Sequence, residues 1–496
     1  MKTYGALALF ACLVLSGAAA WMGGLNQDEG WYLYAANLVA EGEMPYRDFF
    51  FTQGPLLPLI YAPFAVFWKA HGLLGARLFT LSLGLIGVFF SAALAFRLAS
   101  DGERKRAAFL VAFFLLATNL YHLYYLTIPK TYALASLFVS LAFFLLSFVD
   151  ATSSRLKVAS LASAAGLSLA LSAGVRLSLG ILLAVVGLFL LKGAARKTAP
   201  RLAWFFFGLG GALGLLLVYG PFLVDAPSRA GLLAAQAYHR ARGGSDFVWV
   251  VGSLSRLVRW YVPLFVALGF GLFTNAKALR LAPLARLLLW GFLAVFLVQI
   301  LAPFPYEDYQ VPVMSLLAVV AATLLVSSPS LSAASSLLLV LGLSFATSFG
   351  SPLLEKWTTN GQDRFWTRKK ALTELKQLQE AAWLIEAIDP KGTRLLTQDL
   401  YLAVETNRKV PKGLEMGPFA MLTDAEWRAL LRDAPKAYPV AALSGYAFAI
   451  DPPVCKERAF SQQLDYWKIL KESYVPVSQE EAFGQNATPL LILKRK

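Results

Sequence analysis

This chain of 496 residues has few cysteines, few histidines and few charged residues. The two cysteines, Cys12 and Cys455, cannot build a disulfide framework, and three histidines (His71, His122 and His239) are too few for a histidine-rich zinc site. Charged residues make up 15% of the chain. A soluble protein of this length needs far more polar surface, so a soluble globular protein is excluded.

Apolar residues fill most of the chain: 57% of it is hydrophobic, with 36 phenylalanines. They form repeated runs of about twenty residues, the length that crosses a bilayer as a helix. We therefore predict a polytopic α-helical membrane protein with about 11 transmembrane helices. The expected spans are residues 4–23, 76–98, 107–121, 130–149, 158–174, 177–192, 202–224, 257–275, 284–303, 310–327 and 331–349.

The formal net charge of +15 comes largely from short basic clusters between the apolar runs. Examples are Arg104-Lys105-Arg106, Arg155 with Lys157, and Lys277 with Arg280. Such clusters are typical of cytoplasmic loops rather than of a phosphate-binding groove, so we expect no nucleic-acid partner. With these loops in the cytoplasm, the protein is integral to the cytoplasmic membrane and its C-terminus lies outside.

Acidic residues before position 350 gather on the predicted outer side, and only Asp101, Glu103 and Asp150 fall inside. Acidic residues contribute little to orientation. Carboxylates near lipid cost free energy unless they are solvated or used. The asymmetry therefore indicates a working face outside. The outer acids are Asp28, Glu29, Glu41, Glu43, Asp48, Asp225, Asp246, Glu307 and Asp308.

Residues 24–75, between the first two spans, form the first outer loop and are too many for a turn. From Asp28 to Glu41 apolar residues recur at helical spacing, and Gly42 is suited to end a helix. This pattern predicts a helix in the membrane interface with its aromatic face toward lipid. The later run from Gly54 to Trp68 is broken by prolines and predicts a short interfacial or re-entrant helix.

The composition changes at about residue 350. A helical pattern covers 364–388, and short apolar runs at 394–397, 438–450 and 489–493 predict strands. The chain is therefore expected to comprise a transmembrane domain, 1–349, and an extracytoplasmic α/β domain, 350–496. The second domain has no cysteine or histidine cluster and no glycine-rich phosphate loop, so we assign it no chemistry.

Two groups of residues resemble motifs of a known superfamily. The first comprises Asp28-Glu29-Gly30, Pro45-Tyr46-Arg47-Asp48-Phe49, Gly54-Pro55-Leu56 and later Arg77. The second is Tyr306-Glu307-Asp308-Tyr309, where many relatives have a histidine in place of Asp308. The pattern resembles the GT-C superfamily of integral membrane glycosyltransferases, in the bacterial and archaeal branch similar to protein O-mannosyltransferases and aminoarabinose transferases.

This resemblance implies a GT-C-type fold and a transfer reaction. A sugar moves from a polyprenyl-phosphate-linked donor to a glycan, lipid or protein acceptor on the extracytoplasmic face. The resemblance also implies that Asp28 is the catalytic carboxylate. The residues of the second motif, Tyr306, Glu307, Asp308 and Tyr309, are expected to bind substrate.

The chemistry of the acidic residues agrees with this assignment. Attack of a hydroxyl on an anomeric carbon needs a base to take its proton, and Asp28 lies where a lipid-linked sugar would. The alternative is that Asp28 only caps a helix. Glu29 either contacts substrate or is a first-turn charge favourable to the helix dipole. Asp48 either binds the acceptor, acts as a second carboxylate or pairs with Arg47.

The leaving phosphate needs a cation. Lys130 starts a helix at the predicted outer end, and Arg176 lies at the outer turn of a tight hairpin, so these two are our first choices. His239, Arg240 and Arg242 in an outer loop are further candidates. The alternative for each cation is snorkelling to lipid headgroups.

We predict no obligatory metal or other cofactor, although a divalent metal held by Asp28 with Glu29 is possible. A transporter or lipid-linked sugar flippase is the main alternative function. Such proteins place charges near the bilayer midplane and repeat their halves, and neither feature is found in the sequence. A receptor or structural protein would need far fewer spans as an anchor.

Overall fold

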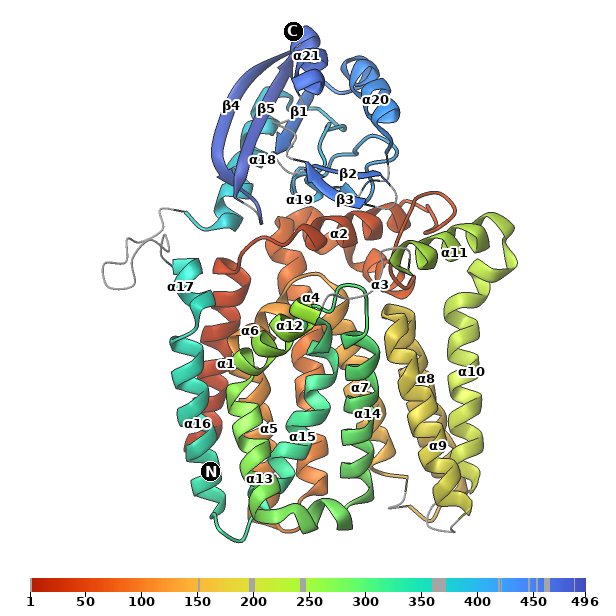
Figure 1. The fold of residues 1–496 in the computed structure, drawn as a ribbon, viewed down its shortest axis with the longest axis vertical. Helices are drawn as coiled ribbons and strands as arrows, with labels where there is room; N and C mark the ends of the chain where they lie inside the picture. Colours follow the sequence, from red (N-terminus) through yellow and green to blue (C-terminus); the bar gives the residue numbers. More distant parts are fainter. Residues whose placement is uncertain are drawn as a thin grey trace.

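The computed structural model describes residues 2–149, 152–195, 201–240, 247–358, 372–417, 420, 422–444, 447–451, 454–458, 464–485 and 487–496. The side chains of residues 2, 194, 238–240, 276–281, 447–467 and 481 are outside this description. Figure 1 shows a bundle of long helices with a smaller α/β domain seated on one end. A helix that lies across the bundle, α2 (Gln27–Ala40), separates the two parts.

Long apolar helices form the bundle, because each apolar run buries one side against its neighbours and leaves the other side for lipid. They are α1 (Lys2–Met22), α4 (Ala65–Leu98), α5 (Gly102–Ala117), α6 (Leu120–Thr127), α7 (Thr131–Leu146), α8 (Arg155–Val175), α9 (Ile181–Ala195), α10 (Arg201–Val224), α13 (Val262–Leu281), α14 (Pro283–Ile300), α15 (Val311–Val326) and α16 (Ala333–Phe349). Shorter elements connect them: α3 (Leu56–Tyr61), η1 (Ala62–Phe64), η2 (Leu177–Gly180), α11 (Ala226–Arg240), α12 (Phe247–Trp260), η3 (Glu307–Gln310) and α17 (Pro352–Thr358).

Within the described residues, seven helices are long and apolar enough to cross a membrane, or nine if each of two bent pairs is one span. The bent pairs are α5–α6 and α12–α13, with angles of 70° and 83°. The polytopic helical fold is thus confirmed, but the count is seven to nine rather than eleven. The two other predicted spans are shorter apolar helices, Thr131–Leu146 and Leu177–Gly193. The first stops before the predicted apolar run 130–149 ends, and the second covers its whole predicted run, 177–192, which is itself short.

The predicted helix after the first span exists as α2, and Gly42 follows it with a φ of +94°. Its predicted orientation is wrong. Trp31, Tyr32 and Tyr34 are only 4%, 2% and 4% exposed. Trp31 and Tyr32 pack against Phe51 of the same outer loop, and the Tyr34 hydroxyl accepts a hydrogen bond from the Val410 amide of the C-terminal domain, so the aromatic side chains meet protein rather than lipid. The same domain also contacts α2 through α19 (Leu400–Glu405). An apolar helix face has the same sequence pattern whether lipid or another domain covers it.

The next predicted short helix is found as α3 followed by η1. Trp68, expected within it, already belongs to α4. That helix has a break at Gly72, where φ is +60° and ψ is −156°. Only glycine adopts such a conformation without strain. The break places Arg77 in the first turns of the helix that continues from Leu73.

The C-terminal domain contains α18 (Glu374–Ile388), α20 (Asp424–Ala437) and α21 (Leu464–Ser473) beside two antiparallel sheets. The larger sheet has the order β1–β5–β4, with Val440 opposite Lys494 and Tyr474 opposite Arg495. The smaller sheet pairs β2 with β3. The strands are β1 (Val440–Ser444), β2 (Ala447–Asp451), β3 (Val454–Arg458), β4 (Tyr474–Phe483) and β5 (Thr488–Arg495).

The mixed α/β character of this domain is confirmed, although its elements differ in detail from those predicted. Residues 438–450 contain β1 and all but the last residue of β2, and β5 contains 489–493. The run 394–397 makes only isolated bridges, such as Leu396 with Ala441, and β3 and β4 were not predicted. Of the predicted helix 364–388, the part before residue 372 is outside the described residues. The boundary at 350 stays a prediction, because α16 and α17 form one apolar segment, Ala333–Thr358.

Candidate active site

Asp28 and Glu29 open α2, and the start of that helix is fixed by a neighbouring residue. The Asn26 side chain accepts a hydrogen bond from the amide of Asp28, at 3.0 Å. The Glu29 carboxylate accepts one from the amide of Asn26, at 2.9 Å, which completes a capping box. The cap is therefore Asn26, and the reading of Asp28 as a mere cap is wrong. Successive helical residues point about 100° apart, so the two carboxylates face different surroundings.

Glu29 faces the interior and pairs with Arg77 from α4. Both side chains are fully buried, with two N–O distances of 2.7 Å. The remaining N–H groups of Arg77 donate to the carbonyls of Ala20, Gly23 and Gly24. All five guanidinium donors are thus used. This arrangement leaves Glu29 no exposed surface for a substrate and ties the start of α2 to the end of α1.

Asp28 faces a partly open cluster of charges. One of its oxygens accepts a hydrogen bond from Trp31 Nε1 at 3.0 Å, and the other lies 2.7 Å from Lys130 Nζ. The same ammonium lies 3.1 Å from Asp308, which also accepts a hydrogen bond from the Tyr132 hydroxyl at 2.8 Å. The side chains of Asp28 and Lys130 are 21% and 11% exposed. One lysine is therefore shared by two carboxylates from distant parts of the chain.

Lys130 directly precedes α7, at the N-terminal cap position. A cation is disfavoured there because the N-terminal end of a helix dipole is positive. The carboxylates of Asp28 and Asp308 offset this cost, and the Tyr132 ring centroid lies 5.0 Å from the ammonium. The lysine is therefore held by side chains of the protein rather than by lipid headgroups.

Arg176 follows α8 and comes to the same cluster. Its guanidinium lies over the rings of Tyr309 and Tyr132, 4.2 and 5.0 Å from their centroids. It donates one hydrogen bond to the Thr131 hydroxyl, at 3.2 Å, while its buried Nε has no partner. Within the part of the chain that the structure describes, no carboxylate pairs with Arg176. The two first-choice cations, Lys130 and Arg176, are thus brought together with Asp28.

The second motif lies on η3, and its members divide between two surroundings. Asp308 and Tyr309 face Lys130 and Arg176, as described above. Glu307 pairs instead with Arg256 of α12, at 3.0 Å. Tyr306 is 42% exposed and packs its ring against Trp249, 5.5 Å between centroids. The first pair belongs to the cluster, and the second pair links η3 to α12.

Asp48 lies apart from this cluster in an exposed loop. It forms an ion pair with Arg47, at 2.7 Å, and accepts a hydrogen bond from the amide of Met44. These hydrogen bonds hold the pKa of Asp48 below its usual range. The predicted local pair with Arg47 is therefore present. The side chains of His239 and Arg240, and all of Arg242, are outside the described residues.

The acidic residues do not fit a divalent cation held between Asp28 and Glu29, because each carboxylate already pairs with a different cationic side chain. Among the described residues there is no group of three or more histidine, cysteine, aspartate or glutamate side chains that could hold a metal. The prediction that no metal is obligatory stays a prediction.

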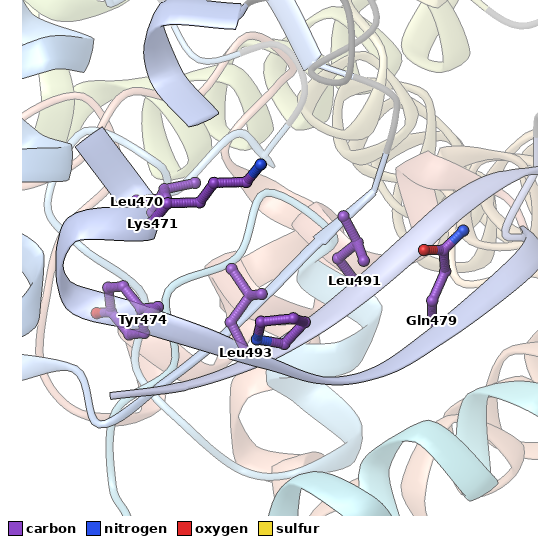
Figure 2. A pocket seen from close by; sticks show the side chains of 7 residues that line it. Leu470, Lys471, Tyr474, Gln479, Leu491 and Leu493 are labelled. Carbon is purple, nitrogen blue, oxygen red and sulfur yellow. The ribbon is translucent and has the colours of Figure 1, made fainter. Parts of the chain in front are cut away.

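Two cavities of about 300 Å³ lie outside the cluster. Figure 2 shows the first, in the C-terminal domain, between α21 and strands β4 and β5. Its lining is mainly apolar, with Lys471 as the one charged side chain, so it offers no acid–base pair. The second lies where the two bent helix pairs meet the end of α16, and Tyr121, Arg259 and Ser348 are among its lining residues.

Sequence reasoning did not assign roles to Arg77, Trp31 or Tyr132, although all three shape the cluster. A signal existed for Arg77, because a lone arginine inside an apolar run must find a partner. Tyr132 lies two residues after Lys130, but nothing in the sequence indicates that its hydroxyl meets Asp308. That contact joins residues 176 positions apart.

No family model matches the chain, and no curated protein sequence matches it significantly. Solved structures do match. ArnT from Cupriavidus metallidurans, bound to undecaprenyl phosphate, has a TM-score of 0.67 at 14% identity, over 99% of this chain and 98% of that one. The oligosaccharyltransferase AglB from Archaeoglobus fulgidus, with an inhibitory peptide and a dolichol-phosphate, has 0.53 at 11%, over 89% and 69%.

The arabinofuranosyltransferase AftD from Mycobacteria also matches, with a TM-score of 0.50 at 15% identity, over all of this chain and 40% of that one. All three are GT-C glycosyltransferases. The likeness confirms the predicted fold: a GT-C-type polytopic membrane protein with a C-terminal domain.

Proposed function

We propose that this protein is a membrane glycosyltransferase. It moves a sugar from a polyprenyl-phosphate-linked donor to an acceptor hydroxyl on the extracytoplasmic face, with Asp28 as the general base. The observation that carries the proposal is the cluster itself: a partly exposed carboxylate beside two cations, Lys130 and Arg176, at one end of the bundle. The bound undecaprenyl phosphate of ArnT and dolichol-phosphate of AglB, on the same fold, agree with it.

The cluster supplies each group that the reaction needs. The acceptor oxygen attacks the anomeric carbon, its proton passes to Asp28, and the bond between that carbon and the phosphate oxygen breaks. The released phosphate keeps the bonding electrons and gains negative charge. Lys130 and Arg176 are the cations that would stabilise it, through charge-assisted hydrogen bonds.

Lys130 has a further role in this mechanism. While it contacts Asp28 at 2.7 Å, its ammonium occupies one of the two Asp28 carboxylate oxygens. A donor phosphate competes with Asp28 and Asp308 for the same ammonium. Binding of the donor would then release Asp28 from its cation, so that this oxygen is open to the acceptor hydroxyl only when substrate is present.

Arg176 suits the phosphate for a different reason. Its Nε is buried without a partner, and such a group costs free energy until it is satisfied. The planar guanidinium can donate two parallel hydrogen bonds to two phosphate oxygens. A lysine ammonium does not offer this bidentate geometry. The rings of Tyr132 and Tyr309 hold this plane in place beside Lys130.

The assay is sugar transfer in membranes supplied with labelled polyprenyl-phospho-sugars, comparing the native protein with Asp28→Asn. The native protein should form product, and the variant should lose at least about 100-fold in rate, as expected for a missing general base. Glu41→Gln is the matched control, because Glu41 lies at the far end of α2 and pairs with the exposed Lys409. Undiminished transfer by Asp28→Asn contradicts the proposal.

The same membranes distinguish the transporter or flippase. Movement of a solute, or of the lipid-linked sugar, across sealed vesicles without any transfer to an acceptor would favour that alternative. Survival of this movement in Asp28→Asn would strengthen it further.

A further inference from the structure

The C-terminal domain touches the catalytic end of α2 through main-chain atoms. A Cβ atom on Gly30 would lie 2.4 Å from the amide nitrogen of Tyr401 and 2.8 Å from the carbonyl carbon of Leu400. Only glycine allows so close an approach. The glycine that follows the two carboxylates is therefore the point where α19 docks on α2, two residues from Asp28.

Three backbone amides around the Arg77–Glu29 pair are bound by side chains of the same domain. Glu374 accepts from the amide of Leu25 at 2.6 Å, and Gln485 accepts from the amide of Gln27 at 2.8 Å. Glu405 accepts from the amide of Leu73 at 2.7 Å. These amides lie at helix starts and breaks, where no partner within the same helix is available.

Glu405 caps the part of α4 that carries Arg77. The helix breaks at Gly72, and a Cβ there would lie 2.3 Å from the Glu405 carboxylate, which shows how closely the carboxylate covers the break. A carboxylate at the start of a helix binds a free amide and interacts favourably with the helix dipole. The C-terminal domain thus supplies an N-cap to a membrane helix.

Glu374 acts on the other side of the pair. The Gly24 carbonyl accepts a hydrogen bond from Arg77, and Glu374 binds the amide of the next residue, Leu25. The backbone on both sides of the Arg77–Glu29 pair is therefore attached to the C-terminal domain. Since Glu29 and Asp28 are neighbours in the first turn of α2, these attachments also determine where Asp28 points.

We propose that the C-terminal domain is a positioning element of the active site. Glu374 and Glu405 hold the backbone around the Arg77–Glu29 pair, and α19 docks on Gly30, so that the Asp28 carboxylate faces Lys130. This inference rests on the proposed sugar transfer and gives a role to a domain without chemistry of its own. A displacement of about 1 Å at a catalytic group can cost about 100-fold in rate.

The experiment compares Glu405→Ala with two matched variants in the full-length protein. Glu405→Gln keeps an oxygen that can accept from the Leu73 amide. Lys409→Gln removes an exposed ion pair with Glu41, at 2.6 Å, which joins the same two domains at the far end of α2. Hydrogen exchange is measured at the amides of Leu25, Gln27 and Leu73, and turnover is measured with a polyprenyl-phospho-sugar that the native protein uses.

Glu405→Ala should speed exchange at Leu73 and at the start of α2. It should lower turnover at saturating donor by about 10- to 100-fold, with the donor KM within about threefold of the native value. Glu405→Gln should restore most of both properties, and Lys409→Gln should change neither. If the contact only stabilised the fold, Glu405→Ala would lower the amount of folded protein. The turnover of each folded molecule would then stay at the native value.

Unchanged exchange in Glu405→Ala overturns the proposal, and so does faster exchange with native turnover. Should Glu405→Ala fail to fold, Glu374→Ala removes the contact on the other side and is judged by the same criteria. The exchange measurement needs no substrate. If the native protein transfers no sugar, the proposed function fails, while exchange at α2 still decides whether the domain holds this helix.

Discussion

Asp28 and Glu29 are adjacent in the sequence, yet they lie in opposite environments. Glu29 is fully buried, and Arg77, its partner, uses every N–H donor. Asp28 is partly exposed and shares Lys130 with Asp308, beside an arginine whose Nε has no partner. An ion pair whose donors and acceptors all have partners cannot bind a ligand and serves the fold. A cluster with an unpaired donor can still accept a ligand. A fully satisfied ion pair and an unsatisfied charge cluster therefore lie within one helical turn.

The two arginines differ in the same way, in how far their partners satisfy them. Arg77 has no capacity for a further partner, and Arg176 forms no ion pair with a carboxylate among the described residues. Substitution of Arg77 should therefore lower the stability of the fold, and substitution of Arg176 should lower ligand binding.

The largest effect on stability is expected from Arg77→Met. The substitution leaves the Glu29 carboxylate buried without a cation, which costs about 3–5 kcal/mol. Thermal unfolding in detergent should show a strongly lowered melting temperature. The double variant Arg77→Met with Glu29→Leu removes both charges and should recover part of the loss. If Arg77→Met melts at the native temperature, the Arg77–Glu29 pair does not stabilise the fold.

A smaller effect, on binding alone, is expected from Arg176→Gln. Hydrogen bonds to a charged group contribute about 1.5–3 kcal/mol, so affinity for undecaprenyl phosphate should fall by about 10- to 100-fold. The measurement is the rise in melting temperature with added undecaprenyl phosphate. Arg256→Gln is the matched control, because Arg256 already pairs with Glu307. Equal stabilisation of both variants would remove Arg176 from the phosphate site.

A third carboxylate, Asp399, has a different environment from Asp28 and Glu29. It is buried with neutral partners, the Tyr401 hydroxyl and the Gln27 amide. Burial raises the pKa of Asp399 to about 6. The folded protein then keeps this proton to a higher pH than the unfolded chain, which releases it near pH 4. The stability contributed by Asp399 is therefore present at low pH and is lost as the pH rises from about 4 to 6.

Asp399→Asn carries no charge at any pH, so it should gain stability relative to the native protein between pH 5 and pH 7.5. The expected gain is on the order of 1 kcal/mol. Melting temperatures of both proteins at the two pH values provide the test, with Asp424→Asn on the surface of α20 as the control. A difference that does not change with pH would show that Asp399 is charged throughout this range.

The smallest effect is expected from Asp48→Asn. Asp48 lies in an exposed loop, where it pairs with Arg47 and the Met44 amide, apart from the Lys130 cluster. Exposed ion pairs contribute little because solvent screens them. The transfer rate should stay within about twofold of the native rate. A loss comparable to that of Asp28→Asn would mean that this loop closes over the cluster during the reaction.

Several of these features could be predicted from the sequence. Apolar runs long enough to cross a bilayer predicted the helical bundle, and the periodic apolar residues after Asp28 predicted α2. Lys130 and Arg176 were found because cations beside apolar helix ends are rare without a function. Each of these signals depends on residues close together in the chain.

The rest depends on contacts between distant residues. No local sequence pattern indicates that Lys130 lies between Asp28 and Asp308. Lys130 and Asp308 are 178 positions apart in the chain. Likewise, the aromatic face of α2 has the composition of a lipid-facing helix, and only its contacts with Phe51 and Val410 show that it meets protein. The strands β3 and β4 were missed because charged residues interrupt their apolar pattern.

The most direct measurement is the single-turnover rate of Asp28→Asn with saturating polyprenyl-phospho-sugar, in a preparation that melts at the native temperature. If Asp28 is the reactive member of the pair, the variant remains folded, binds the donor and transfers sugar at least about 100-fold more slowly. A folded variant that transfers sugar at the native rate would contradict the assignment of chemistry to Asp28.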